Sequence, residues 1–291
     1  WTGRPELPSG PASVYPVEYD GEDVDSKMDR VMRAVKAAGA DGMLVTALDE
    51  IAWLFNLRGT DVAYTPVVMA YAFITNHDRV LFIDQNKVTK QVKDHLKQHD
   101  VKVKDYAEVE KFLSHVSERL TVALDPHRVS DRLGQALMCS KLYIASPIID
   151  LKAMKNEVEI AGYREAMKAD GAALVRAFMW IEANADQGIT ELDVDNRIQQ
   201  ERARCELYRG DSFHTIAGYK EHGAIVHYEA SEQSASTLAP DGLLLVDTGG
   251  QYLNGTTDIT RTITLGNVTD QQRHDYTLVL KGHLALARAV F

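Results

Sequence analysis

Apolar residues recur along the chain at two spacings, and the change of spacing outlines its secondary structure. Over residues 24–38 the apolar positions lie three or four residues apart, which predicts an amphipathic helix. Residues 42–46 form a short apolar run, which predicts a buried strand. Residues 67–75 and 79–83 flank the polar turn Asn76–Asp78 and predict a hairpin.

Helix and strand patterns continue to alternate up to about residue 150. We expect helices over residues 50–56, 87–97, 108–120 and 131–140, and strands over residues 101–103 and 121–124. This rhythm is typical of an α/β domain, which we assign to residues 21–150. Residues 1–20 carry Pro5, Pro8, Pro11 and Pro16 with little periodicity, and they predict an extended connector between domains.

The pattern changes near residue 151. A long Ala-rich helix is predicted over residues 156–183, and Thr190 with Asp193 forms a capping-box pattern for a second helix that reaches about residue 205. Strands are then predicted over residues 211–217, 223–227, 243–247 and 256–265, and a last helix over residues 276–291. Helices followed by antiparallel strands favour an α+β domain over residues 151–291.

Composition and charge narrow the class of protein. The 291 residues include 32 Lys and Arg against 42 Asp and Glu, a net charge of −10, which argues against binding to nucleic acid or an anionic membrane. Cys139 and Cys205 lack paired spacing, so we expect reduced thiols in a cytoplasmic protein. No apolar run is long enough to predict a membrane span. The first residue is not Met and the last helix lacks a stop signal, so we expect truncation at both ends.

Two carboxylates stand out in the strand-rich half. Asp247 ends an apolar strand, and Asp258 begins a Thr-rich strand eleven positions later. If the strands pair about Tyr252–Leu253, the two side chains face each other at about 4.5–5.5 Å, and their repulsion requires a proton or a shared cation. A tight turn at Asn254–Gly255 would instead place Asp258 opposite Gln251. Alternatively, Asp247 caps a turn and Asp258 is solvated, and spacing alone does not decide.

Other polar residues give weaker signals. His227 ends the apolar run 223–227 and is either a core histidine or a donor to a developing oxyanion. We interpret His214 as structural and place Arg261 in a structural ion pair. The aromatic and apolar run 50–59 has helical spacing and is typical of core packing. There is no phosphate-binding glycine motif and no nucleophile elbow.

Three segments together resemble the aminopeptidase P (Xaa-Pro aminopeptidase) family of pita-bread metallopeptidases. They are residues 47–59, residues 223–228, and Val246–Asp247 with Thr257–Thr262. The resemblance is nearest to the long, three-domain cytosolic form. It implies an α/β domain like the creatinase/aminopeptidase P N-domain at residues 21–150. An incomplete α+β pita-bread catalytic domain would follow at residues 151–291.

The resemblance also implies a set of site residues. Family members hold two divalent metal ions, usually Mn²⁺ with Zn²⁺ or Co²⁺ as alternatives, through two Asp, one His and two Glu. Asp247 matches the Asp on one metal, Asp258 matches the bridging Asp, and His227 matches a catalytic histidine that contacts substrate near the scissile bond. The remaining His and two Glu lie in later segments that this chain does not contain. We therefore expect the chain alone to be inactive.

The function implied is hydrolysis that releases the first residue of peptides with proline in the second position. The partners implied are such peptides, a second copy of the full-length protein in a homodimer, and the missing C-terminal part of the same protein. Two alternatives remain open. The first is an inactive pita-bread binding module, which the presence of both carboxylates and His227 disfavours. The second is a prolidase-type dipeptidase, which only the resemblance distinguishes from an aminopeptidase P.

Overall fold

The structure, a computed structural model, describes residues 2–290. It consists of two compact units that divide between Ala161 and Gly162, inside helix α8 (Glu157–Asn184). Each unit has a hydrophobic core of its own, and each is described here by itself. Among the described residues, no helix has the combination of length and apolar character that crossing a lipid bilayer requires.

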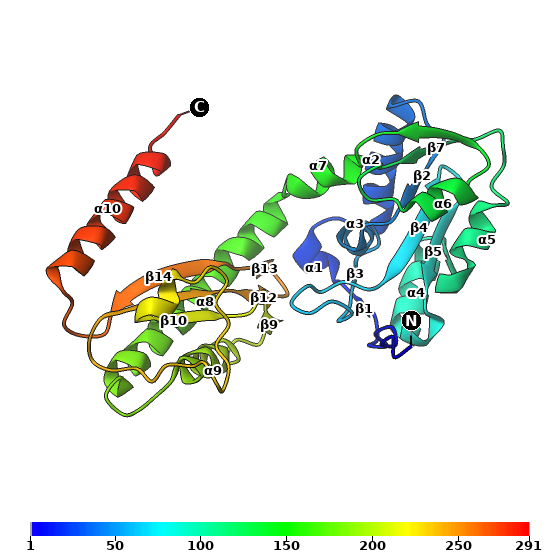
Figure 1. The fold of residues 1–291 in the computed structure, drawn as a ribbon. Coiled ribbons are helices and arrows are strands. Elements are labelled where there is room, and N and C mark those ends of the chain that lie inside the picture. Colours follow the sequence, from blue (N-terminus) through cyan, green and yellow to red (C-terminus); the bar gives the residue numbers. More distant parts are fainter. Residues whose placement is uncertain (1, 291) are drawn as a thin grey trace. The chain divides into compact units, whose positions relative to one another are not determined.

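A mixed sheet forms the centre of the first unit (Figure 1). It has six strands in the order β6-β5-β4-β2-β7-β8. Its strands are β2 (Gly42–Val45), β4 (Ala70–Thr75), β5 (Arg79–Ile83), β6 (Val101–Lys104), β7 (Thr121–Leu124) and β8 (Ser140–Tyr143). Strands β2, β7 and β8 run parallel, whereas β4 and β5 form the predicted antiparallel hairpin. All four residues of β2 are buried, as expected for a strand that is covered on both faces.

Helices cover both faces of this sheet. One face packs against α2 (Val24–Ala37), α3 (Leu48–Leu54), α4 (Lys90–Gln98) and α7 (Pro147–Ala153). The opposite face packs against α5 (Val109–Leu113) and α6 (Asp131–Ala136). Successive strand residues alternate between the two cores, so that Met43 and Val45 join the first core and Leu44 joins the second. The unit is therefore an α/β domain, as the sequence predicts.

Two boundaries in this unit differ from the sequence-based expectations. The helix expected over residues 131–140 ends at Leu137, whose backbone is extended, and Ser140–Tyr143 pairs with β7 as β8. Pairing with β7 gives the backbone N–H and C=O groups of residues 140–143 hydrogen-bond partners. The spacing of apolar residues within the segment does not reveal such a distant partner. The helix expected over residues 108–120 is likewise shorter. A small two-stranded sheet, β1 (Ser13–Val14) with β3 (Leu57–Arg58), and helix α1 (Val17–Asp20) complete the unit.

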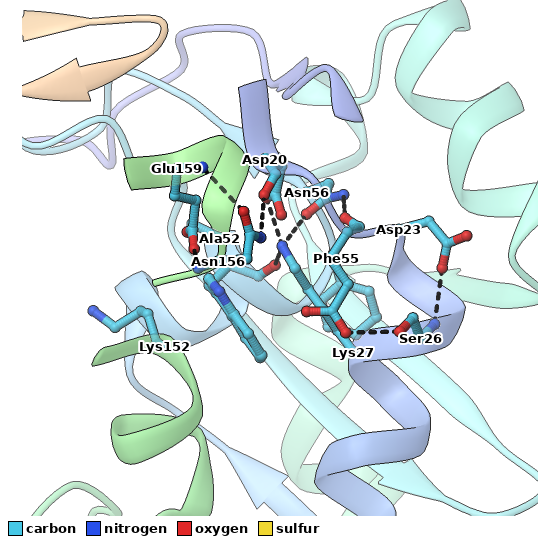
Figure 2. A network of polar contacts seen from close by, with 12 residues as sticks. Asp20, Asp23, Ser26, Lys27, Ala52, Phe55, Asn56, Lys152, Asn156 and Glu159 are labelled. Atoms are coloured by element: carbon cyan, nitrogen blue, oxygen red, sulfur yellow. Dashed lines mark hydrogen bonds and ion pairs between the residues drawn. The ribbon is translucent and has the colours of Figure 1, made fainter. Parts of the chain in front are cut away.

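A buried polar network ties α1, α2 and α3 together (Figure 2). Lys27 is fully buried, and its Nζ donates to Asp20 Oδ2 at 2.5 Å, to Asn56 Oδ1 at 2.6 Å and to the Trp53 carbonyl oxygen at 3.0 Å. Asn156, at the start of α8, donates through Nδ2 to the Asp20 carbonyl oxygen at 2.7 Å. The network thus fixes the point at which the chain leaves the first unit.

The second unit places two helices, α8 and α9 (Glu191–Arg202), against a sheet of order β10-β11-β14. These strands are β10 (Ile216–Tyr219), β11 (Leu243–Thr248) and β14 (Ile259–Thr264), and all pairs are antiparallel. A second sheet has the order β13-β12-β9, formed by β13 (Gly255–Thr256), β12 (Gly250–Tyr252) and β9 (Tyr208–Asp211). Leu244 and Val246 of β11 pack toward the helices, so Asp247 lies on the opposite face. This is the predicted α+β arrangement.

The strand expected over residues 223–227 is wrong. Residues Lys220–Ala224 form a 3-10 helix instead, and the chain folds back so closely that a Cβ on Gly218 would collide with the backbone of Gly223. The expected strand 211–217 is also divided between β9 and β10. The last helix, α10 (Asp270–Ala287), begins at a Thr269 capping box, earlier than residue 276, and contains no buried residue.

Candidate metal centre

The two candidate metal carboxylates do not face each other directly. In the pairing of β11 with β14, Asp247 lies opposite Thr260, and Tyr252 pairs with Gly255 across a tight turn at residues 253–254. The predicted register about Tyr252–Leu253 is therefore wrong by two positions. The Thr260 hydroxyl donates to Asp247 Oδ1 at 2.8 Å, which favours the observed pairing. A two-residue shift keeps side chains on the same face, so Asp258 is a diagonal neighbour of Asp247.

A single cavity of about 410 Å³ is lined by both carboxylates and by His227. Its other lining residues come from the segment before β10, from β10 itself and from the segment after the 3-10 helix: Phe213, His214, Ile216, Tyr228 and Glu229. Ile216 pairs with Asp247 across β10 and β11, which explains how that segment reaches the site. The structure thus brings together the three residues that the sequence singles out.

His214 and Glu229 both line the cavity, and the sequence did not indicate that they lie next to each other. His214 Nδ1 lies 3.8 Å from Glu229 Oε1 at the cavity wall. Fifteen positions separate them in sequence, and only the fold-back after β10 brings them together, so no local pattern could have identified the pair. Arg261 also differs from expectation. Its guanidinium donates to the Thr260 carbonyl oxygen, and within residues 2–290 it has no carboxylate partner.

His227 lies on an exposed loop with a left-handed backbone, at a φ of 54°. This conformation is uncommon for a residue other than glycine and persists only where the surroundings hold it. The next residue, Tyr228, is buried, and its hydroxyl donates to Glu191 Oε2 at 2.9 Å. Burial and the nearby Glu191 carboxylate raise the pKa of Tyr228, so its hydroxyl keeps its proton and remains a donor at neutral pH.

Glu191 is the centre of the contacts that hold this loop. Its carboxylate is fully buried at the start of α9 and accepts hydrogen bonds from the backbone N–H groups of Tyr219 at 2.7 Å and Ser236 at 2.8 Å. His222 Nδ1 lies 2.9 Å from Glu191 Oε1, and the His222 ring stacks on Tyr228. One buried carboxylate therefore anchors the segments on both sides of His227.

The donor chemistry of the site fits divalent cations. Carboxylate oxygens are hard ligands, and two of them line one cavity, where a cation between them would relieve their repulsion. Within residues 2–290 no three His, Cys, Asp or Glu side chains come close enough to form a complete metal site. Asp247 and Asp258 fit as carboxylate ligands of such a cation.

Both units match known families. Residues 3–159 match the creatinase/prolidase N-terminal domain, and residues 161–291 match metallopeptidase family M24. A probable Xaa-Pro aminopeptidase P of Aspergillus niger is 40% identical over 301 aligned residues, and one of Pyricularia oryzae is 34% identical over 312. Each alignment covers 99% of this chain and 49% of the relative, so the chain spans about half the length of these curated relatives.

Solved structures give the same assignment. An X-prolyl aminopeptidase of Caenorhabditis elegans, described as a cytosolic enzyme with a di-nuclear active site, superposes with a TM-score of 0.93 at 32% identity and covers all of this chain and 49% of its own. An Xaa-Pro dipeptidase of Bacillus anthracis shares the fold, with a TM-score of 0.72 at 19% identity over 90% of this chain and 71% of its own. The chain therefore belongs to the pita-bread metallopeptidases of family M24 that carry a creatinase/prolidase N-terminal domain.

Proposed function

We propose that the protein containing this chain is a metal-dependent aminopeptidase that releases the N-terminal residue from peptides with proline in the second position. The observation that carries the proposal is the cavity lined together by Asp247, Asp258 and His227. The names of the Aspergillus niger and Caenorhabditis elegans relatives support the choice of substrate class.

Each of these side chains has a role in the proposed reaction. Two divalent cations, when bound, would activate a water molecule and polarise the carbonyl of the scissile bond. Asp247 would hold one cation and Asp258 both, with the Thr260 hydroxyl orienting the Asp247 carboxylate. His227, on its fixed loop, would donate a hydrogen bond to the substrate where negative charge develops on the carbonyl oxygen.

Proline in the second position suits such a site. An Xaa-Pro bond has no backbone N–H, so peptidases that require this donor from their substrate cannot bind it well. A site that acts through cations and a histidine donor does not require that group. This argument supports the Xaa-Pro class and leaves the physiological peptide open to experiment.

The domain assignment belongs to the same proposal. We assign residues 1–20 to a connector that packs on the first unit through β1 and α1, residues 21–150 to a non-catalytic α/β domain and residues 151–291 to the first half of the catalytic domain. Helix α10 supports the last assignment, since Val279 is 74% and Leu286 70% exposed on a helix with no buried residue. The proposed cover for these side chains is the later part of the M24 domain, which would also supply one His and two Glu ligands.

Three further properties extend the proposal from the family resemblance. The metal is Mn²⁺, with Zn²⁺ or Co²⁺ as alternatives. The full-length protein is a homodimer, which light scattering after size-exclusion chromatography tests. The compartment is the cytosol, as described for the Caenorhabditis elegans relative.

A peptide-release assay tests the function. The complete protein with Mn²⁺ should release the first residue of an Xaa-Pro-Pro peptide, should lose this activity in a chelator, and should recover it when Mn²⁺ is restored. The 291-residue chain alone should be inactive. Cleavage of an Xaa-Pro dipeptide in preference to the longer peptide would favour a prolidase-type dipeptidase. An inactive complete protein would favour a binding module.

A further inference from the structure

A fully buried ion pair lies beneath the candidate metal centre. Arg202 of α9 and Asp170 of α8 are both 0% exposed. Arg202 Nε donates to Asp170 Oδ1 at 2.7 Å, and its second amino group reaches Asp170 Oδ2 at 3.3 Å, so the contact is bidentate. Two charges removed from water in this way need further polar partners, because desolvation otherwise outweighs their attraction.

The remaining donor group of Arg202 is directed at the segment that follows Asp247. Its NH1 donates to the Thr248 hydroxyl at 2.7 Å and to the Gly249 carbonyl oxygen at 2.9 Å. Thr248 is the residue next to Asp247 and points to the opposite face of β11. Arg202 therefore fixes the backbone from which Asp247 projects, without touching the Asp247 carboxylate.

Asp170 makes the corresponding contact beside Asp258. The Thr257 hydroxyl donates to Asp170 Oδ2 at 2.6 Å and accepts from the Gly250 backbone N–H at 2.9 Å. Thr257 is 1% exposed, whereas its neighbour Asp258 is exposed to the cavity. The Tyr252 hydroxyl also donates to Asp170, at 2.9 Å. The two members of one ion pair thus each hold the residue adjacent to one candidate metal ligand.

The backbone between these threonines is tightly packed. A Cβ on Gly249 would collide with the Thr257 carbonyl oxygen and with the Ser212 hydroxyl. That hydroxyl donates to the Thr257 carbonyl oxygen at 2.8 Å, and the Thr257 backbone N–H donates to the Gly250 carbonyl oxygen at 2.9 Å. Little freedom remains for the residue 247 segment to move relative to the residue 258 segment.

We propose that the Arg202–Asp170 ion pair positions the two metal-binding carboxylates, by fixing Thr248 and Thr257 and thereby the separation of Asp247 and Asp258. This inference rests on one part of the proposed function, namely that Asp247 and Asp258 bind cations. Arg202 and Asp170 are positioning residues, since neither lines the cavity. Groups that orient metal ligands affect metal affinity by about 10- to 100-fold when they are removed.

The test uses Thr257, because replacing Arg202 or Asp170 would remove a charged partner from a buried charge and could prevent folding. Thr257→Val keeps the shape of the side chain and removes the hydroxyl, and Thr257→Ser keeps the hydroxyl. Thr256→Val is the matched control, since among residues 2–290 that exposed hydroxyl bonds only Gln251 Oε1, at 2.7 Å. Ser146→Ala controls for stability, because it removes a 2.6 Å hydroxyl–carboxylate bond, to Glu50, in the first unit.

Mn²⁺ affinity of the complete protein is measured by titration calorimetry, with circular dichroism to verify folding. We expect Thr257→Val to bind Mn²⁺ at least about tenfold more weakly, and Thr257→Ser and both controls to bind as the wild type does. Wild-type affinity in Thr257→Val, an equal loss in Ser146→Ala, or no Mn²⁺ binding by the wild type would each overturn the proposal. A wild type that binds Mn²⁺ but releases no residue from Xaa-Pro peptides would contradict the proposed function alone.

Discussion

The Asp258 carboxylate has few interactions with the rest of the described chain. Among residues 2–290 no side chain donates a hydrogen bond to it, and it lies exposed at the wall of the cavity beside His227. Asp247, by contrast, is half-buried and accepts from Thr260. A carboxylate without a local partner gains most from a cation, so Asp258 should contribute the larger part of the binding free energy.

The first prediction follows from this difference. Asp258→Asn keeps the shape of the side chain and removes its charge, and it should abolish tight Mn²⁺ binding to the complete protein, with at least a hundredfold weaker affinity by calorimetry. Asp186→Asn, the same change at an exposed loop position whose carboxylate accepts from Gln187, should leave affinity unchanged. Unchanged affinity in Asp258→Asn would remove this residue from the metal centre.

A second residue-scale prediction concerns the buried pair in Figure 2. Burial raises the pKa of Asp20 and lowers that of Lys27, which shows that desolvation opposes both charges. Lys27→Met should lower the free energy of unfolding by about 3–5 kcal/mol, because it leaves Asp20 without its cation. Adding Asp20→Asn should restore much of that loss. Denaturant unfolding followed by fluorescence of the adjacent Trp53 measures both variants, and an additive loss would argue against coupling.

At the scale of the element, long periodic segments were predictable and irregular ones were not. The helix expected over residues 156–183 is α8 (Glu157–Asn184), because its length makes helical spacing unambiguous. The buried run at residues 50–59 also packs as expected, with Ile51, Leu54 and Phe55 in the core. The run 223–227 misled because its apolar residues are not buried in a strand: Ile225 is 52% and Val226 84% exposed, in a turn that follows a 3-10 helix.

The sequence could single out residues that the structure brings to one cavity, but it could not predict their geometry. Asp247, Asp258 and His227 line one cavity, but the register of β11 with β14 differs from the expected one by two positions. Period-two alternation determines only which face a side chain occupies, so any even shift leaves the same pattern. The turn at residues 253–254 determines the register, but its sequence carries no signal strong enough to exclude the other registers.

Helix α9 provides a pH-dependent prediction. Glu201 is 1% exposed; burial acts to raise its pKa, but Arg176, Arg197 and Arg204 together lower the pKa below its ordinary range. A carboxyl whose folded-state pKa is lowered adds stability above its unfolded pKa of about 4.3, and this contribution is lost as the pH falls through the folded-state value.

Glu201→Gln should therefore be less stable than the wild type at pH 7, by about 1–3 kcal/mol, and the difference should shrink below about pH 4. Urea denaturation at pH 7, 5 and 3.5 measures the free energy of unfolding of both proteins. Glu182→Gln, an exposed carboxylate on α8, serves as the control and should show little difference at any pH. A difference for Glu201→Gln that is constant with pH would rule out an ionic origin.

At the scale of the whole molecule, the rhythm of elements was sufficient to indicate two architectures, α/β followed by α+β. Two family models match the chain: the creatinase/prolidase N-terminal domain over residues 3–159 and metallopeptidase family M24 over residues 161–291. The chain spans 49% of its Aspergillus niger relative, and within residues 2–290 no complete metal-ligand cluster is present.

We propose above all that the side chains at positions 247 and 258 share divalent cations. Anomalous diffraction at the manganese absorption edge, from crystals of the complete protein grown with Mn²⁺, tests it directly. We expect two anomalous peaks about 3.5–4 Å apart, one bound by Asp247 and both bound by Asp258. Carboxylates directed into solvent, with no peak between them, would contradict it.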